Sequence, residues 1–193
     1  VTDAGNGTAG ATLSCPVALT NAATRTFTVA DDGTTATDLS IGNAISTTGA
    51  LTKAGAGTIQ FNFSTNTYTG ATTISAGTLQ LGVAGVVNNS SPIDLNGGTL
   101  SSGAAAGFGE NFSTLDLSAS STIALGTGSH SLQFAASNGV SWTGGAFLTV
   151  TGWTGGYDGT SGTAGKIFAG SDASGLTATQ VAQIRFFNGT AYS

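Results

Sequence analysis

The sequence predicts an all-β fold: a parallel β-helix, or β-solenoid, with one short helix near the C-terminus. Two patterns predict it. Short runs alternate apolar and polar residues, which is typical of strands with one buried face. These runs recur about every 20 residues, and a repeat of that length is typical of one solenoid coil. The composition agrees, because 31 Gly, 33 Thr and 21 Ser among 193 residues leave too few strong helix formers for a helical bundle.

The first half of the chain carries the repeat most clearly. Three Gly-Thr-apolar triplets are offset by 20 and 21 residues, at 57–59, 77–79 and 98–100. On the same spacing we expect one series of strands at 39–41, 59–61 and 79–81, and a second series at 72–74, 93–95 and 115–117. Gly and Asn between these runs fit corners that need a positive φ or a close backbone approach. We therefore expect the coils to span residues 31–135.

Toward the C-terminus the repeat becomes looser. Residues 136–193 are expected to form an irregular cap with larger turns and one short helix. Thr177-x-x-Gln180 resembles a capping box and predicts a helix over 178–183, with a last strand over 183–187. A helix at the end of a solenoid commonly covers an otherwise open edge.

Charge and cysteine content exclude several classes of protein. Four Lys+Arg against nine Asp+Glu give a formal net charge of -5, so no basic face is available for nucleic acid. One Cys and one His cannot build a disulfide framework or a Cys/His metal site. No apolar stretch approaches the roughly 20 residues of a membrane span. The segment 1–3 has no feature of a signal peptide, and we expect that one has already been removed.

Few residues are candidates for chemistry, and we predict no catalytic, cofactor-binding or metal-binding residue. His130 lies between two serines, but a Ser/His pair would also need an orienting carboxylate, so a turn or surface role is expected. Asp94 and Asp116 are central in two successive apolar-Asp-apolar strands and could stack on one outer face. Paired carboxylates can do acid–base work or bind Ca²⁺, although solvent-facing carboxylates that aid solubility are the favoured interpretation. The Asp-Asp-Gly run at 31–33 is expected to be a turn.

Two segments are candidates for contacts between subunits. Residues 1–30 are expected to be an N-terminal arm or first strand that can be donated to a neighbour, because 25–29 alternate as a strand does. The block 176–187 is a plausible partner surface. The candidate interface residues are Arg25, Phe27, Val29, Val181, Ile184, Phe186 and Phe187.

Three aromatic residues and the single cysteine each have two interpretations. Trp142 and Trp153, each followed by Thr-Gly-Gly, could form a sugar-stacking surface together with Tyr157. In a chain poor in large side chains, core plugs at a solenoid end are the favoured alternative. Cys15 could form an intermolecular disulfide, whereas a buried small hydrophobe is the favoured alternative.

Residues 49–82 resemble the autotransporter-associated β-strand repeat. The resemblance rests on Lys-x-Gly-x-Gly-Thr at 53–58 and Tyr-Thr-Gly at 68–70, which occur in order. Residues 141–155 also resemble the region that follows such repeats in secreted bacterial surface proteins. The resemblance implies a right-handed parallel β-helix, export from the cell and a surface or extracellular location. It brings no catalytic residues.

From these features we expect an extracellular structural protein that is not an enzyme and needs no cofactor. It would be a self-assembling subunit of a bacterial surface filament or layer, joined to its own copies by β-edge pairing. The alternative is a surface adhesin or glycan-binding module, and a carbohydrate-active β-helix enzyme ranks third. Homo-oligomers or homopolymers are the expected partners, a glycan is a candidate ligand, and neither nucleic acid nor a membrane span is expected.

Overall fold

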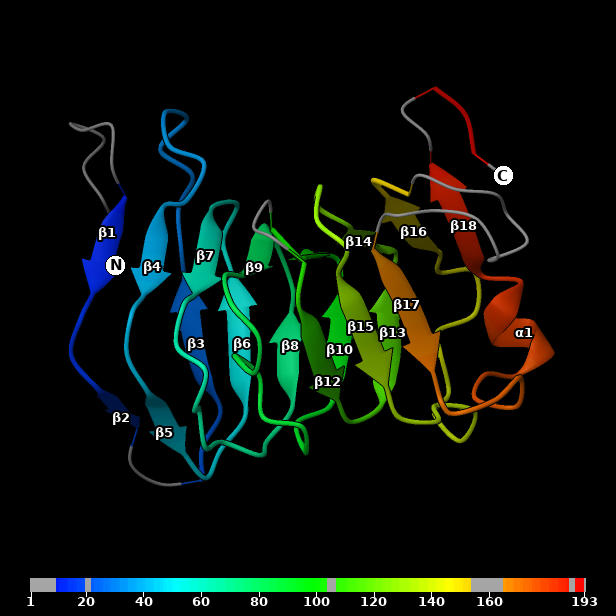
Figure 1. The fold of residues 1–193 in the computed structure, drawn as a ribbon, viewed down its shortest axis with the longest axis horizontal. Coiled ribbons are helices and arrows are strands. Elements are labelled where there is room, and N and C mark those ends of the chain that lie inside the picture. Colours follow the sequence, from blue (N-terminus) through cyan, green and yellow to red (C-terminus); the bar gives the residue numbers. More distant parts are fainter. Residues whose placement is uncertain (1–9, 20–21, 104–106, 154–164, 188–189, 193) are drawn as a thin grey trace.

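The chain winds into a parallel β-solenoid in the computed structural model (Figure 1). The structure describes residues 10–19, 22–103, 107–153, 165–187 and 190–192. Within these ranges every pairing between named strands is parallel, so each strand must be joined to its neighbour by a full coil of chain. The predicted fold class is confirmed.

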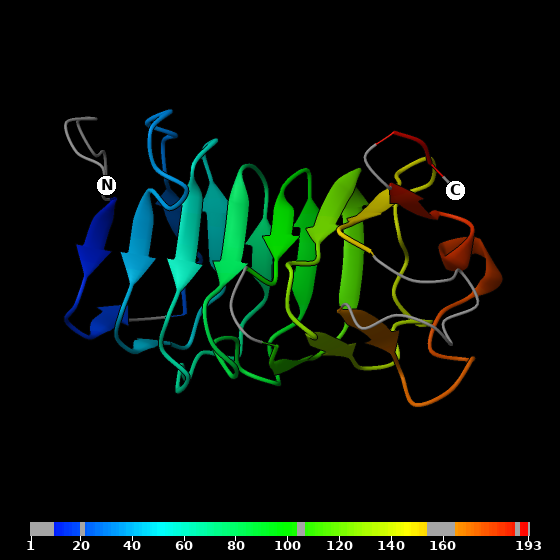
Figure 2. The ribbon, with the colours of Figure 1, turned by 45° about the horizontal axis from the view of Figure 1, so that its top comes forward.

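The coils build three sides of a rod. An eight-stranded sheet runs its whole length (Figure 2), in the order β1 (Ala11–Leu13), β4 (Leu39–Ile41), β7 (Thr58–Phe61), β9 (Thr78–Leu81), β11 (Thr99–Ser101), β14 (Ser121–Ala124), β16 (Leu148–Thr151) and β18 (Ile184–Phe187). A five-stranded sheet forms the second side, in the order β13 (Leu115–Ala119), β10 (Ile93–Asn96), β8 (Thr72–Ile74), β6 (Leu51–Ala54) and β3 (Arg25–Thr28).

The third side is divided between two smaller sheets. Near the N-terminal end it consists of β2 (Val17–Leu19) and β5 (Ile45–Thr47), and near the C-terminal end of β12 (Gly109–Phe112), β15 (Ser131–Phe134) and β17 (Lys166–Ala169). Between β5 and β12 no strand lies on this side in the described chain. The helix α1 (Ala178–Val181) lies beside β18 at the end opposite β1 (Figure 1).

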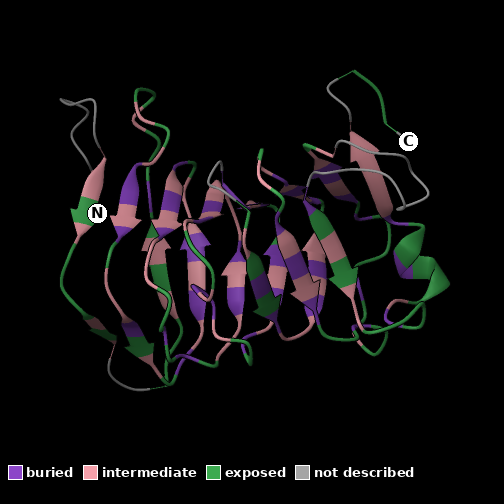
Figure 3. Cartoon of the chain, in the orientation of Figure 1, coloured by how far each residue is buried: buried purple, intermediate pink, exposed green. Residues whose placement is uncertain are grey.

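Aliphatic side chains fill the interior in ladders, one residue per coil. Because alternate residues of a strand point to the same face, parallel strands in register stack like side chains on each other. One ladder along the eight-stranded sheet runs from Ala11 to Phe186, and its fully buried part consists of six residues: Leu39, Ile59, Leu79, Leu100, Ile123 and Val150. None of these six is more than 1% exposed, and each buried side chain contributes about 1.5–3 kcal/mol. Figure 3 shows the resulting buried bands crossing successive strands.

The outer face of the same sheet carries a row of threonines. They are in register from β7 to β16: Thr58, Thr78, Thr99, Thr122 and Thr149. Threonine suits this position because its branched Cβ favours the extended backbone and its hydroxyl can remain in water. The Gly-Thr-apolar repeat of the sequence is therefore a corner, an outward residue and an inward residue.

The C-terminal helix forms as its capping box predicts, although it is shorter. The Thr177 side chain accepts from the Gln180 N–H, and the Gln180 side chain accepts from the Thr177 N–H. The helix ends at Val181 and not at 183, because the chain turns at Ala182 to enter β18. Gln180 is buried and donates through Nε2 to the carbonyls of Ser137 and Val140, both at 2.9 Å, which fixes the helix to the preceding loop.

The sheets extend through all three segments expected from the sequence. β1, β2 and β3 of residues 1–30 pair with β4, β5 and β6 of the same chain, and β16, β17 and β18 of residues 136–193 continue two of the sheets. The boundaries at 30/31 and 135/136 stay a prediction, as does donation of the first strands to a neighbour.

Stacked corners bring backbone into close contact, and Gly77 is an example from the middle of the repeat. Its φ is +61°, which favours glycine, and a Cβ at this position would overlap the carbonyl oxygens of Gly55 and Gly57 in the preceding coil. Those carbonyls belong to the backbone and cannot move away without breaking the corner.

We predict that Gly77→Ala destabilises the fold by about 2–3 kcal/mol or more, through overlap and positive φ together. Gly139→Ala is the matched control, since nothing lies within 4 Å of a Cβ at Gly139. Urea unfolding followed by circular dichroism measures both variants. Equal stability of the two would contradict the crowded-corner account.

Candidate functional site

The N-terminal end of the rod presents the edges of three strands. Within the described residues β1, β2 and β3 each pair with one strand only. In β1 the Ala11 N–H donates to the Asp38 carbonyl at 2.8 Å, and the Leu13 carbonyl accepts from the Gly42 N–H at 2.9 Å. Because hydrogen-bonding direction alternates along a strand, the N–H and C=O of Thr12 between them point to the free side.

The same alternation holds in β3. The N–H groups of Arg25 and Val29 donate to the carbonyls of Ala50 and Ala54 in the next coil, each at 2.9 Å. The peptide groups of Thr26 and Thr28 therefore point away from β6. The end of the rod thus offers outward N–H and C=O groups from more than one strand.

The predicted interface residues of this end point inward. Arg25 and Phe27 are in register with the buried residues Leu51 and Lys53 of the next coil, so their side chains lie on the interior face. Both are half-buried, because they stand in the first coil of the sheet. Val29 is a core residue at 2% exposure. The end face is consequently apolar around its rim, where further half-buried side chains pack on the core: Ala11, Leu13, Val17 and Leu19.

Cys15 lies at the corner between β1 and β2 and is exposed. The alternative of a buried small hydrophobe is therefore wrong. An intermolecular disulfide at this corner stays a prediction.

At the C-terminal end the edge strands are β13, β17 and β18, and the chain itself covers the edge of β13. Leu115 in the edge strand β13 donates its N–H to Ser137 Oγ at 2.9 Å, and its carbonyl accepts from Trp142 Nε1 at 3.0 Å. The Thr143 N–H donates to the Leu117 carbonyl at 2.9 Å. The loop 137–143 thus provides the partners that another strand would provide, and β13 needs no further coil.

The three aromatic residues proposed for sugar contact do not form one surface in the described residues. Trp142 is only 8% exposed, so it is a core plug and offers no open ring face to a sugar. Trp153 is half-buried, with its ring centroid 5.6 Å from that of Phe186. Tyr157 lies outside the described residues.

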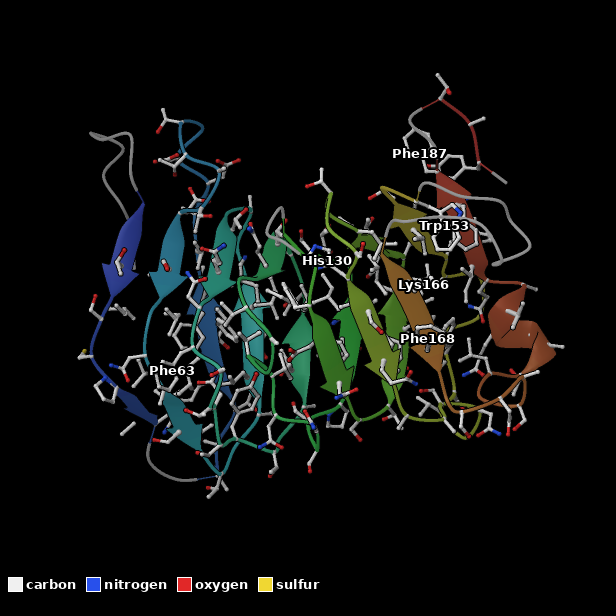
Figure 4. All side chains as sticks on the ribbon, in the orientation of Figure 1. Phe63, His130, Trp153, Lys166, Phe168 and Phe187 are labelled. Carbon is white, nitrogen blue, oxygen red and sulfur yellow. The ribbon has the colours of Figure 1, made fainter. Side chains whose placement is uncertain are left out.

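An apolar cavity of about 170 Å³ lies inside the last coils. Its walls are all apolar side chains, among them Phe134, Trp153, Ile167 and Phe186 (Figure 4 labels Trp153). Ile184 also lines it, so two residues of the predicted partner surface, Ile184 and Phe186, point into the protein. Val181 and Phe187 differ: Val181 on α1 is 56% exposed, and Phe187 is half-buried on β18.

Lys53 of the repeat motif is a buried cation. It occupies an interior ladder between Phe27 and Ile74 and is 3% exposed. Its Nζ donates to the carbonyls of Ala54, Gly55 and Ala76, at 2.9, 2.7 and 3.0 Å. Burial lowers the pKa of its ammonium to about 8, and the Asp38 carboxylate partly opposes this. The motif lysine therefore joins the corners of two successive coils.

The Asp-Asp-Gly run forms the expected turn. The side chain of Asp31 accepts from the Gly33 N–H at 2.8 Å, and that of Asp32 accepts from the Thr34 N–H at 2.7 Å, which lowers the pKa of Asp32. Buried Asp38 accepts from the Asp32 N–H at 3.0 Å. Carboxylate oxygens of Asp31, Asp32 and Asp38 lie within 4.8 Å of one another, an oxygen set that could suit a hard cation. Asp31 and Asp32 make the contacts of a turn, whereas Asp38 also accepts from the Thr58 N–H in the next coil at 2.7 Å.

Where strands are missing on the third side, buried side chains connect the coils. Asn66 accepts from the Ile45 N–H at 2.6 Å and donates to the Val86 carbonyl at 2.7 Å, so it bridges three coils. Glu110 is 1% exposed and accepts from the N–H groups of Gly85 and Val87. Burial raises the pKa of Glu110 to about 7, although the N–H groups oppose the shift. Sequence reasoning missed Glu110, whose one signal is that it is the chain's single Glu.

His130 is buried, so the expected surface role is wrong, although it lies in the connection before β15, where its N–H donates to the Gly128 carbonyl at 2.9 Å. It is 2% exposed, and its ring meets that of Phe108 edge-on with centroids 4.6 Å apart. Neither ring nitrogen has a hydrogen-bond partner among the described residues. Burial lowers the pKa of the imidazole and favours the neutral ring. Figure 4 shows His130 near the middle of the rod, away from both ends.

Asp94 and Asp116 are in register on neighbouring strands, as their spacing predicts. Thr73 donates to Asp94 at 3.3 Å, and the Leu117 N–H donates to Asp116 at 2.7 Å. Partial burial raises the pKa of Asp116, with a smaller contribution from the Asp94 charge. Their stacking is therefore a property of the sheet, and their acid–base or Ca²⁺ role stays a hypothesis.

Comparison with known proteins identifies one segment. Residues 51–81 match the family model of the passenger-associated-transport-repeat, and they fall within the stretch whose motifs resemble such repeats. No curated protein and no solved structure matches the chain. The repeat and the solenoid together point to a passenger-like surface protein. No helix in the described ranges has the length and apolar character needed to cross a membrane.

We expect Lys53→Met to lower the free energy of unfolding by about 2–4 kcal/mol, because three buried carbonyls lose their donor. Lys166→Met, which removes an exposed cation from β17, should change it by less than about 0.5 kcal/mol. Denaturant unfolding of both variants at pH 7 makes the comparison. An equal loss of unfolding free energy in both variants would mean that the change in net charge causes it, and that the contacts of Lys53 with the corner carbonyls do not.

Glu110 should make stability depend on pH. Its pKa rises from 4.5 to about 7 on folding, so its stabilisation is complete below pH 4.5 and is lost as pH rises through 7. The loss should reach up to about 3 kcal/mol. We predict that Glu110→Gln removes this slope, measured as the difference between wild-type and variant unfolding free energies at pH 4.5 and 7.5. The lowered pKa of His130 changes stability with pH in the opposite direction. Because wild type and variant both contain His130, its contribution cancels in the difference between them. A pH-independent difference would overturn the assignment.

Proposed function

We propose that this protein is a secreted, non-catalytic structural component of a bacterial surface. It assembles with copies of itself by adding strands to the open N-terminal end of the solenoid. The match of residues 51–81 to a passenger-associated repeat supports the surface location. Assembly is the part that the experiment below addresses.

The observation that carries the proposal is the difference between the two ends. The loop 137–143 supplies hydrogen-bond partners to β13, whereas β1, β2 and β3 each have a single partner in the described chain. Unpaired edge groups are a template for another strand. A parallel strand from a second copy would satisfy them and would cover the apolar rim at the same time.

The first coil also has little that prevents such pairing. Natural edge strands usually avoid association by means of Lys, Pro or a bulge. The strands β1 and β2 have the sequences Ala-Thr-Leu and Val-Ala-Leu, with no charge and no proline. β3 has one cation, Arg25, at its first residue and on its interior face. The sequences of these three strands therefore do not prevent pairing with a strand from another copy.

A contact between this end and a different surface of the next copy is heterologous. Heterologous contacts that do not close into a ring produce open filaments. The eight-stranded sheet has β1 at one end and β18 at the other. An antiparallel bridge between Phe187 and Tyr192 occupies one end of the β18 edge, so pairing of β1 with the rest of that edge would extend the sheet from subunit to subunit. The charged fraction of 7% keeps like-charge repulsion between subunits small.

The test uses Thr12→Pro, which removes the outward N–H of β1 while leaving the N–H of Ala11 and the carbonyl of Leu13 paired with the next coil. Thr12→Val is the matched control, since it keeps the N–H. We expect filaments of the wild type and of Thr12→Val in electron micrographs, and loss of most assembled mass for Thr12→Pro in sedimentation.

Urea unfolding of the dispersed subunits must show that Thr12→Pro is folded. Uniform wild-type monomers at high concentration, or filaments that form equally well from folded Thr12→Pro, would disprove assembly through this edge.

A further inference from the structure

An arginine on the outer face of the eight-stranded sheet is held among aromatic rings. Arg185 of β18 is in register with Thr149 of β16, so it ends the outward row of threonines. Its guanidinium carbon lies 3.7 Å from the centroid of the Phe147 ring and 5.0 Å from that of Tyr192. Phe187, the next outward residue of β18, has its ring 4.9 Å from that of Tyr192. Figure 4 labels Phe187 on this strand.

The cation of Arg185 has no anionic partner in the part of the chain that the structure describes. No carboxylate there lies within ion-pair distance, and its Nε is shielded from solvent without a hydrogen-bond acceptor. Arg185 is one of four Lys and Arg residues in a chain of net charge -5. An anion from outside the described chain could therefore neutralise this cation.

The rings around this cation leave apolar surface open. Phe147 is 37% exposed and Tyr192 is 59% exposed, both among the most exposed large apolar residues of the described chain. They hold the guanidinium plane by cation–π contact, so less side-chain entropy is lost when it binds an anion. A planar guanidinium prefers a carboxylate, which it can bind through two parallel hydrogen bonds.

Hydroxyl groups complete the surroundings. Thr149 and Thr151 of β16 are half-buried and point outward beside Arg185 and Phe187. One small area therefore combines a cation that favours carboxylate, aromatic faces that can stack on the C–H face of a sugar ring, and hydroxyls that can bond to sugar hydroxyls. A uronic acid sugar has all three complementary features in a single ring.

We propose that Phe147, Arg185, Phe187 and Tyr192 form a binding site for the carboxylate of a uronic acid residue in an acidic polysaccharide. The same carboxylate chemistry occurs in acidic peptides, which lack the sugar ring that would use the aromatic faces and the threonines. The site uses outward side chains of β18, whereas the proposed assembly uses backbone groups along the edges of β18 and of β1 in the next copy.

The test measures binding of the full chain to an oligogalacturonate by calorimetry, with the neutral galactose oligomer of equal length and a glutamate-rich peptide as comparison ligands. We expect the oligogalacturonate to bind at least tenfold more tightly than either, with affinity falling as salt rises. Arg185→Gln should weaken binding at least tenfold, and Arg185→Lys should restore part of it.

Tyr192→Ala should also weaken binding, because it removes a stacking face, whereas Lys166→Met on another side of the rod should leave affinity unchanged. Unfolding midpoints establish that each variant is folded. The proposal is overturned if the wild type fails to bind oligogalacturonate, if the peptide binds as tightly, or if folded Arg185→Gln binds like the wild type. Thr12→Pro subunits should bind normally, so failure of the assembly proposal and failure of this one are distinguishable.

Discussion

Parallel hydrogen bonding between successive coils is the constraint on which this structure depends. Each coil leaves N–H and C=O groups that only the next coil, or a substitute for it, can satisfy. The register that this imposes places like residues above one another, which is why Leu39, Ile59 and Leu79 form one continuous interior ladder. Where the third side lacks strands, Asn66 and Glu110 bond to backbone groups of neighbouring coils. These buried polar side chains therefore take the place of the backbone hydrogen bonds that strands would make on that side.

At each end of the rod the last coil has no further coil to pair with. The ends must therefore differ from the repeating coils between them. At the C-terminal end, Ser137 and Trp142 satisfy the edge of β13, and Gln180 joins α1 to the same loop. At the N-terminal end the described strands keep outward backbone groups beside an apolar rim. An end of this kind is completed by more strands of matching direction, so interaction with another coil follows from the geometry of the backbone more than from any side-chain motif.

The regular part of the molecule could be predicted from the sequence because it is local. Alternation and spacing specify strands such as 59–61 and 79–81, and the Thr177–Gln180 pair specifies the helix start. The exceptions depend on partners one or more coils away. Alternation from Leu51 places Lys53 inside, yet its acceptor at Ala76 is 23 residues distant. Glu110 likewise bonds to a loop 25 residues earlier, and no local pattern specifies that loop's position.

Four ionisable residues interrupt the apolar or threonine rows of the repeat. They differ in whether the chain supplies hydrogen-bond partners for them. Lys53 and Glu110 are buried charges in apolar ladders, and both have backbone partners on every side, so their role is to hold coils together. The ring nitrogens of His130 have no hydrogen-bond partner among the described residues, but the ring is buried, and burial lowers its pKa and favours the neutral form. Arg185 differs from all three, because it lies on the outer face among exposed rings and its Nε has no acceptor within the described chain. Such a residue at the end of a row of threonines is a feature that folding alone does not require, and the proposed carboxylate ligand would explain it.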